Sequence, residues 1–289
     1  MAELALLLLT IFWGSTFLIT KRLLAASSPG IFLSLRFALA ALTLGLVWWL
    51  TQARPRAGLV RDGVRLGLAL TGGFILQTIG LRYTSPARSG FLTGLTVLFV
   101  PLVAHFGLGK PVHRATWAGA ALAIVGMAVM TRPFDGSVSA AMRLGDALTV
   151  GCAIAFAAHI VWTSEWALRH PVAPFLFVQV CVAAVASLGV VAFETPRVGS
   201  PVQLAAVVGY TGVVMTAGAI FLQTWAQRHT TAVRAALIFS LEPVFAALFA
   251  WLAGGDHIVA AEWVGGAVII AGVLLGEITP RESQASAAR

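Results

Sequence analysis

The stretch Gly72-Gly73-Phe74-Ile75-Leu76-Gln77-Thr78 returns 146 residues later as Gly218-Ala219-Ile220-Phe221-Leu222-Gln223-Thr224. The same offset, without a gap, carries Arg82, Thr84, Arg88, Leu95, Phe99, Trp117, Gly119 and Gly126 onto Arg228, Thr230, Arg234, Leu241, Phe245, Trp263, Gly265 and Gly272. Apolar low-complexity sequence matches itself by chance, but chance does not align Gln, Trp and Arg in one register. The sequence therefore predicts an internal duplication.

The composition around this repeat is that of a membrane protein. Of the 289 residues, 59% are hydrophobic and only 10% are charged, and the mean hydropathy is +0.91. Soluble domains carry about 25% charged residues, so this chain lacks the charge to solvate a surface. The net charge of +8 could indicate a nucleic-acid partner. Most Lys and Arg, however, fall in short breaks between apolar runs, where such charges meet lipid headgroups. We expect contact with membrane lipid and no nucleic-acid partner.

Ten apolar stretches are long enough to span a bilayer, which takes about 20 residues. They cover residues 2–21, 31–51, 63–82, 87–108, 113–131, 144–166, 173–193, 202–226, 232–253 and 259–278. An even number of spans places both ends of the chain on one side. Counted at the ends of the spans and in the connections between them, Lys and Arg number 11 on that side against 7 on the other, which predicts cytoplasmic termini.

The offset divides the ten spans into two units of five. Because five is odd, the second unit has to cross the membrane upside down relative to the first. We predict an all-α integral membrane protein of ten transmembrane helices, arranged as two inverted five-helix repeats around a central cavity. The repeats would cover residues 1–135 and 143–280, with a cytoplasmic tail at 281–289. Inverted repeats are frequent in secondary transporters, whose substrate site lies near the midplane where the halves meet.

Short motifs along nearly the whole chain resemble the EamA-type drug/metabolite transporters. They are Trp13-Gly14-Ser15-Thr16-Phe17 with Lys21, Leu35-Arg36-Phe37, Tyr83-Thr84-Ser85, Leu241-Glu242-Pro243-Val244-Phe245 and Trp263-x-Gly265. The resemblance implies export or exchange of small metabolites, amino acids included, with helices 5 and 10 at the periphery. Within the family the chain is most similar to bacterial aromatic amino acid exporters, which implies the bacterial inner membrane. Gly109-Lys110 and Gly255-Asp256 depart from the Gly-Glu that many members have there.

Polar and aromatic side chains within the spans are the candidate substrate-binding residues. Helical spacing puts Trp13, Thr16 and Phe17 on one face of the first span, and another such face lies on the sixth. The alternative for each is helix packing, with hydroxyls and imidazole bonded inside the bundle. Arg36 and Glu242 are costly in a membrane and are equally consistent with an architectural role. The expected set is Trp13, Thr16, Phe17, Phe74, Gln77, Thr96, Phe156, His159, Trp162, Thr163, Gln223 and Glu242.

These residues favour a secondary transporter that exports neutral and aromatic amino acids by alternating access. The aromatic rings can surround a substrate ring, while Thr hydroxyls and Gln amides can bind its zwitterionic end. Sugar phosphates are disfavoured, since few basic residues lie in the spans. One alternative is an intramembrane enzyme, but the sequence has neither an HExxH motif nor paired carboxylates. Another is a channel-like protein, which would more typically show charge rings or a carbonyl filter. We predict no catalytic residue, metal or cofactor.

Two further expectations concern energy coupling and assembly. His159 is the first candidate for proton coupling, because an imidazole can change charge near physiological pH, and Glu242 is the second. Facilitated diffusion is the alternative, and we place it slightly ahead because no carboxylate–histidine relay is evident. Glycines in the fifth and tenth spans predict close helix packing. These two helices would serve as scaffold or as the contact of a weak homodimer, the other possibility being a monomer.

Overall fold

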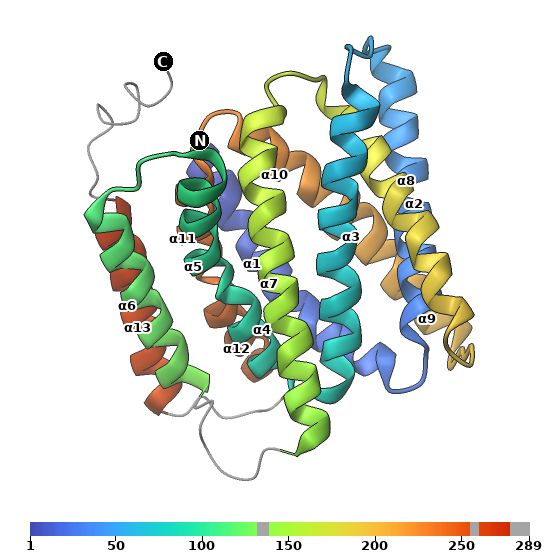
Figure 1. Cartoon of the computed structure of the whole chain (residues 1–289). Coiled ribbons are helices and arrows are strands. Elements are labelled where there is room, and N and C mark those ends of the chain that lie inside the picture. The colour runs from blue at the N-terminus through green and yellow to red at the C-terminus, as the bar shows by residue number, and fades with distance from the viewer. Residues whose placement is uncertain (132–138, 255–259, 278–289) are drawn as a thin grey trace.

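A computed structural model describes residues 1–131, 139–254 and 260–277, nearly all of them helical (Figure 1). The predicted tail at 281–289, and the predicted repeat ends at 132–135 and 278–280, lie outside the described residues. The first half contains α1 (Ala2–Leu24), α2 (Pro29–Thr51), α3 (Leu59–Tyr83), α4 (Pro86–Gly94), α5 (Thr96–Leu102), the π-helix η1 (Val103–Gly107) and α6 (Arg114–Thr131). The second contains α7 (Ala140–Trp166), α8 (Val172–Ala192), α9 (Pro201–Gly209), the π-helix η2 (Tyr210–Gly218), α10 (Ala219–Gln227), α11 (Ala232–Phe239), α12 (Glu242–Gly254) and α13 (Ala260–Glu277).

These elements form the ten predicted helical rods. Eight helices in the described residues are long and apolar enough to cross a membrane, and two shorter apolar helices lie within α6 and α13. Three of the long rods are composite: α4, α5 and η1 form the fourth, α9, η2 and α10 the eighth, and α11 and α12 the ninth. The expectation of ten helices is confirmed.

Contacts between α6 and α13 show that the two repeats are inverted. A Cβ built on Gly119 would lie 2.6 Å from the carbonyl oxygen of Gly272, and one built on Gly126 would lie 2.7 Å from that of Gly265. The partner's residue number falls as the first helix's number rises, so the two helices are antiparallel. The offset of 146 also exchanges one pair for the other, as a two-fold pseudosymmetry axis requires.

The same symmetry appears in the packing of the other helices. α3 lies against α7, and its counterpart, the rod of α9, η2 and α10, lies against α1. α2 lies against α8, the helix onto which the 146-residue offset carries it. α6 and α13 pack mainly on each other at one edge of the bundle, as expected for helices 5 and 10 (Figure 1). The glycines of α6 and α13 therefore make contacts within one chain. A homodimer formed through these two helices stays a prediction.

The fourth and ninth rods begin and break at matching positions. Ser85 caps α4 by accepting from the Arg88 amide at 3.2 Å, and its mate Thr231 caps α11 by accepting from the Arg234 amide at 3.2 Å. Further along, α4 gives way to α5 at Leu95, and α11 gives way to α12 at Ser240 and Leu241. Both breaks lie inside the bundle. At both breaks the regular helical hydrogen bonds give way to shorter-range ones, such as Leu95 N–H to the Leu92 carbonyl and Ser240 N–H to the Leu237 carbonyl.

Candidate functional site

A cavity lies between the two halves of the bundle and is lined by α1, α2, α3, α4, α5, α7, α10, α11 and α12. Its empty volume, which includes space open to solvent, is about 710 Å³. The two helix breaks border it, with Thr93, Gly94 and Thr96 on one side and Phe239, Ser240 and Glu242 on the other. The first of these groups maps onto the second by the 146-residue offset. The cavity therefore lies at the pseudosymmetric junction of the repeats.

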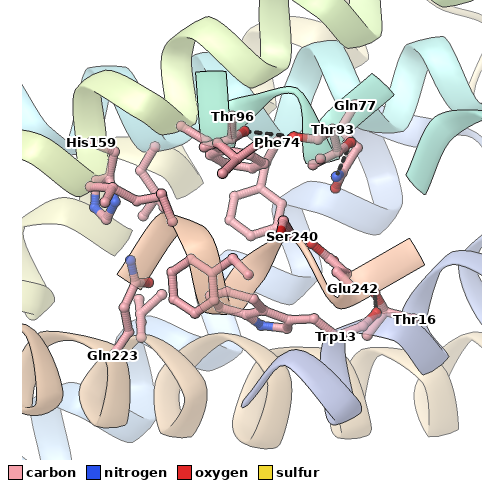
Figure 2. A pocket seen from close by; sticks show the side chains of 18 of the residues that line it. Trp13, Thr16, Phe74, Gln77, Thr93, Thr96, His159, Gln223, Ser240 and Glu242 are labelled. Atoms are coloured by element: carbon pink, nitrogen blue, oxygen red, sulfur yellow. Dashed lines mark hydrogen bonds between the residues drawn. The ribbon is translucent and has the colours of Figure 1, made fainter. Parts of the chain in front are cut away.

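Nine of the twelve residues expected to bind substrate line this cavity (Figure 2). They come from six different helices, so the fold brings together side chains that are far apart in the sequence. The nine are Trp13, Thr16, Phe74, Gln77, Thr96, Phe156, His159, Gln223 and Glu242.

Three of the expected residues do not line this cavity. Phe17 is buried with Leu24, Leu81 and Ala246, because neighbouring helices close over its part of the α1 face. Trp162 stacks on Trp166 with ring centres 6.1 Å apart. Thr163 is fully buried and its hydroxyl makes no hydrogen bond in the described structure. Trp162 and Thr163 lie about one helical turn beyond His159, past the end of the cavity along the axis of α7.

Aromatic rings form the apolar wall of the cavity. Phe74 meets Phe156 edge to face with centroids 5.2 Å apart, and it meets Phe37 in the same manner at 5.3 Å. Across the cavity, Trp13 packs against Phe239 at 5.2 Å, while its indole donates to the Met215 carbonyl at 3.3 Å. These contacts fix the orientation of the rings. They leave aromatic surface available to a flat apolar ligand.

Amides and hydroxyls supply neutral polar groups on both sides. Gln77 donates to the Thr93 hydroxyl at 3.2 Å. Its repeat mate Gln223 donates instead to the Gln227 side chain at 3.0 Å. Thr96 donates to the carbonyl of Thr93 at 2.6 Å across the first helix break (Figure 2). Each Gln retains further hydrogen-bonding capacity toward the cavity.

His159 is held by a neutral partner. Its Nε2 lies 2.9 Å from Oε1 of Gln179 on α8, and both side chains are buried. Among the described residues, no acidic group forms an ion pair with this imidazole. The arrangement matches a neutral imidazole hydrogen-bonded within the bundle.

Two residues of opposite charge also border the cavity. The Arg36 side chain is almost fully buried, donates from Nε to the Thr216 hydroxyl at 2.7 Å, and places its guanidinium carbon 4.4 Å from the Phe74 ring centre. Glu242 is also buried and starts α12 at the second break. Within the described part of the chain, neither side chain forms an ion pair, and the Glu242 carboxylate accepts no hydrogen bond either.

The sequence-based set omitted four polar or aromatic lining residues: Arg36, Thr93, Phe239 and Ser240. Two sequence signals could have found the last three. Thr93 and Phe239 are repeat mates, and each lies three residues before an expected site residue. Ser240 is the next residue after Phe239 and lies two residues before Glu242, so the same signal includes it. Arg36 could have been included because a membrane-embedded cation is by default a functional-site candidate.

Comparison with known proteins agrees with this architecture. A model described as the EamA-like transporter family matches residues 1–132 and 143–276. An uncharacterized transporter of Archaeoglobus fulgidus is 28% identical over 274 residues, covering 95% of this chain and 85% of that protein. The uncharacterized transporter YyaM of Bacillus subtilis is 27% identical over 284 residues, covering 92% and 90%. A crystal structure, titled only as that of a protein, aligns over 97% of both chains with a TM-score of 0.79 at 20% identity, which supports the fold alone.

The family match covers both halves of a chain that crosses the membrane many times and encloses a cavity between inverted repeats. The protein therefore belongs to the EamA-like transporter family and is a multi-pass membrane transporter of small molecules.

Proposed function

We propose that the protein exports neutral amino acids, aromatic ones included, by alternating access through the central cavity. The observation that carries this proposal is the pairing of aromatic walls with neutral polar groups in one cavity. Phe74, Phe156, Trp13 and Phe239 provide ring surface, and Gln77 and Gln223 provide amides from opposite halves. Such a lining suits an amphipathic ligand with a flat apolar end and a polar end.

Phosphorylated substrates fit this lining poorly. Arg36 is the one Lys or Arg among the residues that border the described cavity, whereas phosphate binding usually takes several cationic or backbone N–H donors. The Lys and Arg distribution supports placing both termini in the cytoplasm, and the resemblance to bacterial exporters supports placing the protein in the bacterial inner membrane. Export of an accumulated amino acid would then run down its gradient, without a separate energy source.

Counterflow in liposomes tests the proposal. Purified protein is reconstituted in liposomes preloaded with unlabelled phenylalanine or threonine, and entry of the labelled amino acid is followed. Saturable, transient accumulation is expected, because a carrier exchanges one bound molecule for another. Glucose 6-phosphate in place of the amino acid should give none. Linear, unsaturable flux would indicate a channel, and transport of the sugar phosphate without the amino acids would refute the substrate assignment.

The aromatic wall can be tested separately with Phe74→Leu. Removing one ring should weaken phenylalanine counterflow relative to threonine counterflow by about 2- to 10-fold, since aromatic pairs contribute about 0.5–1.5 kcal/mol beyond their area. Phe193→Leu is the matched control, because the Phe193 side chain is 94% exposed and outside the cavity. An equal loss for both substrates in Phe74→Leu would point to a packing defect in place of a substrate contact.

A further inference from the structure

The cavity contains two opposite charges that come from different halves of the protein. Arg36 lies on α2 of the first repeat and Glu242 at the start of α12 in the second. Both border the same cavity, with only 4% and 8% of their surface exposed. No ion pair within 4.0 Å joins them to each other or to any other described residue. Burying an uncompensated charge costs several kcal/mol, so a ligand that carries both counter-charges would relieve both.

The geometry of Arg36 prepares it for a carboxylate. Thr216 accepts from Nε at 2.7 Å, and the same hydroxyl donates to the Thr211 carbonyl at 2.7 Å, so Thr216 is itself held in place within η2. The Phe74 ring supports the face of the guanidinium. One N–H group is engaged in this way, and the planar fork of terminal nitrogens remains available to bind a carboxylate through two parallel hydrogen bonds.

Glu242 is placed to receive a cation. An ionised carboxylate only accepts hydrogen bonds, and no described donor supplies one to it. It occupies the first turn of α12, beside the second helix break. In Figure 2 the Glu242 side chain lies near Thr16 and Ser240, at the far end of the cavity from His159 and Gln223.

We propose that Arg36 binds the carboxylate of the substrate and Glu242 its ammonium group, so that the site selects zwitterions and fixes their orientation. This inference rests on the proposed amino acid transport and names the residues that would impose its selectivity. A ligand with one of the two charges leaves the opposite protein charge buried and unpaired. A site built around paired polar groups rejects such analogues strongly for this reason. The aromatic wall then contacts the side chain of the bound amino acid.

Three related ligands separate the two contacts: phenylalanine, 2-phenylethylamine without the carboxylate, and 3-phenylpropionate without the ammonium group. Each is tested as a competitor of labelled phenylalanine counterflow, and as a stabiliser of the detergent-solubilised protein against heat. The second measurement remains available for a variant that binds but no longer transports. In the wild-type protein, each analogue should compete at least about 10-fold more weakly than phenylalanine.

The variants should lose selectivity in opposite directions. Arg36→Gln should bind phenylethylamine as well as phenylalanine, whereas Glu242→Gln should bind phenylpropionate as well as phenylalanine. Arg22→Gln, at an exposed arginine outside the cavity, should retain the wild-type order. If both cavity variants fold and keep the wild-type order, or weaken all three ligands equally, the charges are architectural and this inference fails while amino acid transport stands. If no amino acid binds or is exchanged by the wild-type protein, the proposed function fails together with the inference.

Discussion

At the scale of single residues, His159 carries the clearest prediction about energy coupling. Its hydrogen-bond partner is the uncharged Gln179, at 2.9 Å, and both side chains are buried. A glutamine at position 159 can preserve a hydrogen bond to that amide without a titratable group. We therefore expect His159→Gln to retain phenylalanine counterflow within about two-fold, as for a conservative change of a neutral hydrogen-bonding group.

The measurement is amino acid accumulation in liposomes with and without an imposed pH gradient. Facilitated diffusion predicts the same accumulation under both conditions, for the wild-type protein and for His159→Gln. Accumulation that follows the gradient in the wild-type protein and disappears in the variant would make His159 the coupling residue and contradict this prediction.

Sequence reasoning indicated which types of residue would line the cavity, but neither how far the cavity extends along each helix nor which side chains would hydrogen-bond each other. Trp13, Thr16 and His159 were identifiable because a polar or aromatic group inside an apolar span is unusual. Thr163 was selected on the same helical face as His159, but helical spacing alone does not say where along the axis a cavity ends. Nor could it predict that Gln223 would bond Gln227. The position that matches Gln227 in the first repeat is Leu81, so the mate of Gln223 has no such partner.

At the scale of elements, the close backbone contact between α6 and α13 predicts a position where substitution will destabilise the protein. A Cβ on Gly126 would lie 2.7 Å from both the Gly265 carbonyl oxygen and the Ile269 amide nitrogen. Backbone cannot move aside as a flexible side chain can. Gly126→Leu should therefore separate α6 from α13 and destabilise the protein by about 1–3 kcal/mol, the usual cost of overpacking.

Thermal denaturation in detergent, followed by the loss of the monodisperse peak in gel filtration, measures this effect. Val125→Leu is the matched control, since the neighbouring Val125 is 54% exposed and can accept a larger side chain. Equal denaturation temperatures for the two variants would show that the glycine contact contributes nothing to stability.

At the scale of the whole molecule, the inverted arrangement makes a prediction about membrane orientation. Ala57 lies in the connection between α2 and α3, on the side of the termini, and Thr195 lies in the connection between α8 and α9, on the opposite side. Both are exposed. In a cysteine-free background, Thr195→Cys in intact bacterial spheroplasts should react with a membrane-impermeant maleimide. Ala57→Cys should react only after lysis. The reverse pattern would place the termini outside the cytoplasm.

The overall fold was largely predictable because the membrane leaves few choices. Backbone polar groups in lipid have to be satisfied within each segment, so apolar runs of adequate length become helices. The ungapped 146-residue offset and the odd number of spans per repeat then required inversion. The sequence did not predict that three of the rods would be interrupted. Leu95 and its mate Leu241 are ordinary helix formers, and the second break has a proline just after it, Pro243, whose missing N–H interrupts the helical hydrogen bonds.

The difference between Thr96 and its repeat mate Glu242 bears on which conformation the substrate-free protein prefers. If the two halves were identical, turning the molecule over would reproduce it, and in a symmetric bilayer its inward-open and outward-open forms would have equal free energy. Thr96 satisfies its hydroxyl on nearby carbonyls, whereas Glu242 presents a carboxylate. In a carrier of the proposed kind, unlike mates such as these set the equilibrium constant between the two forms. The side of the membrane to which the substrate-free cavity mainly opens is therefore determined by the positions at which the two repeats differ.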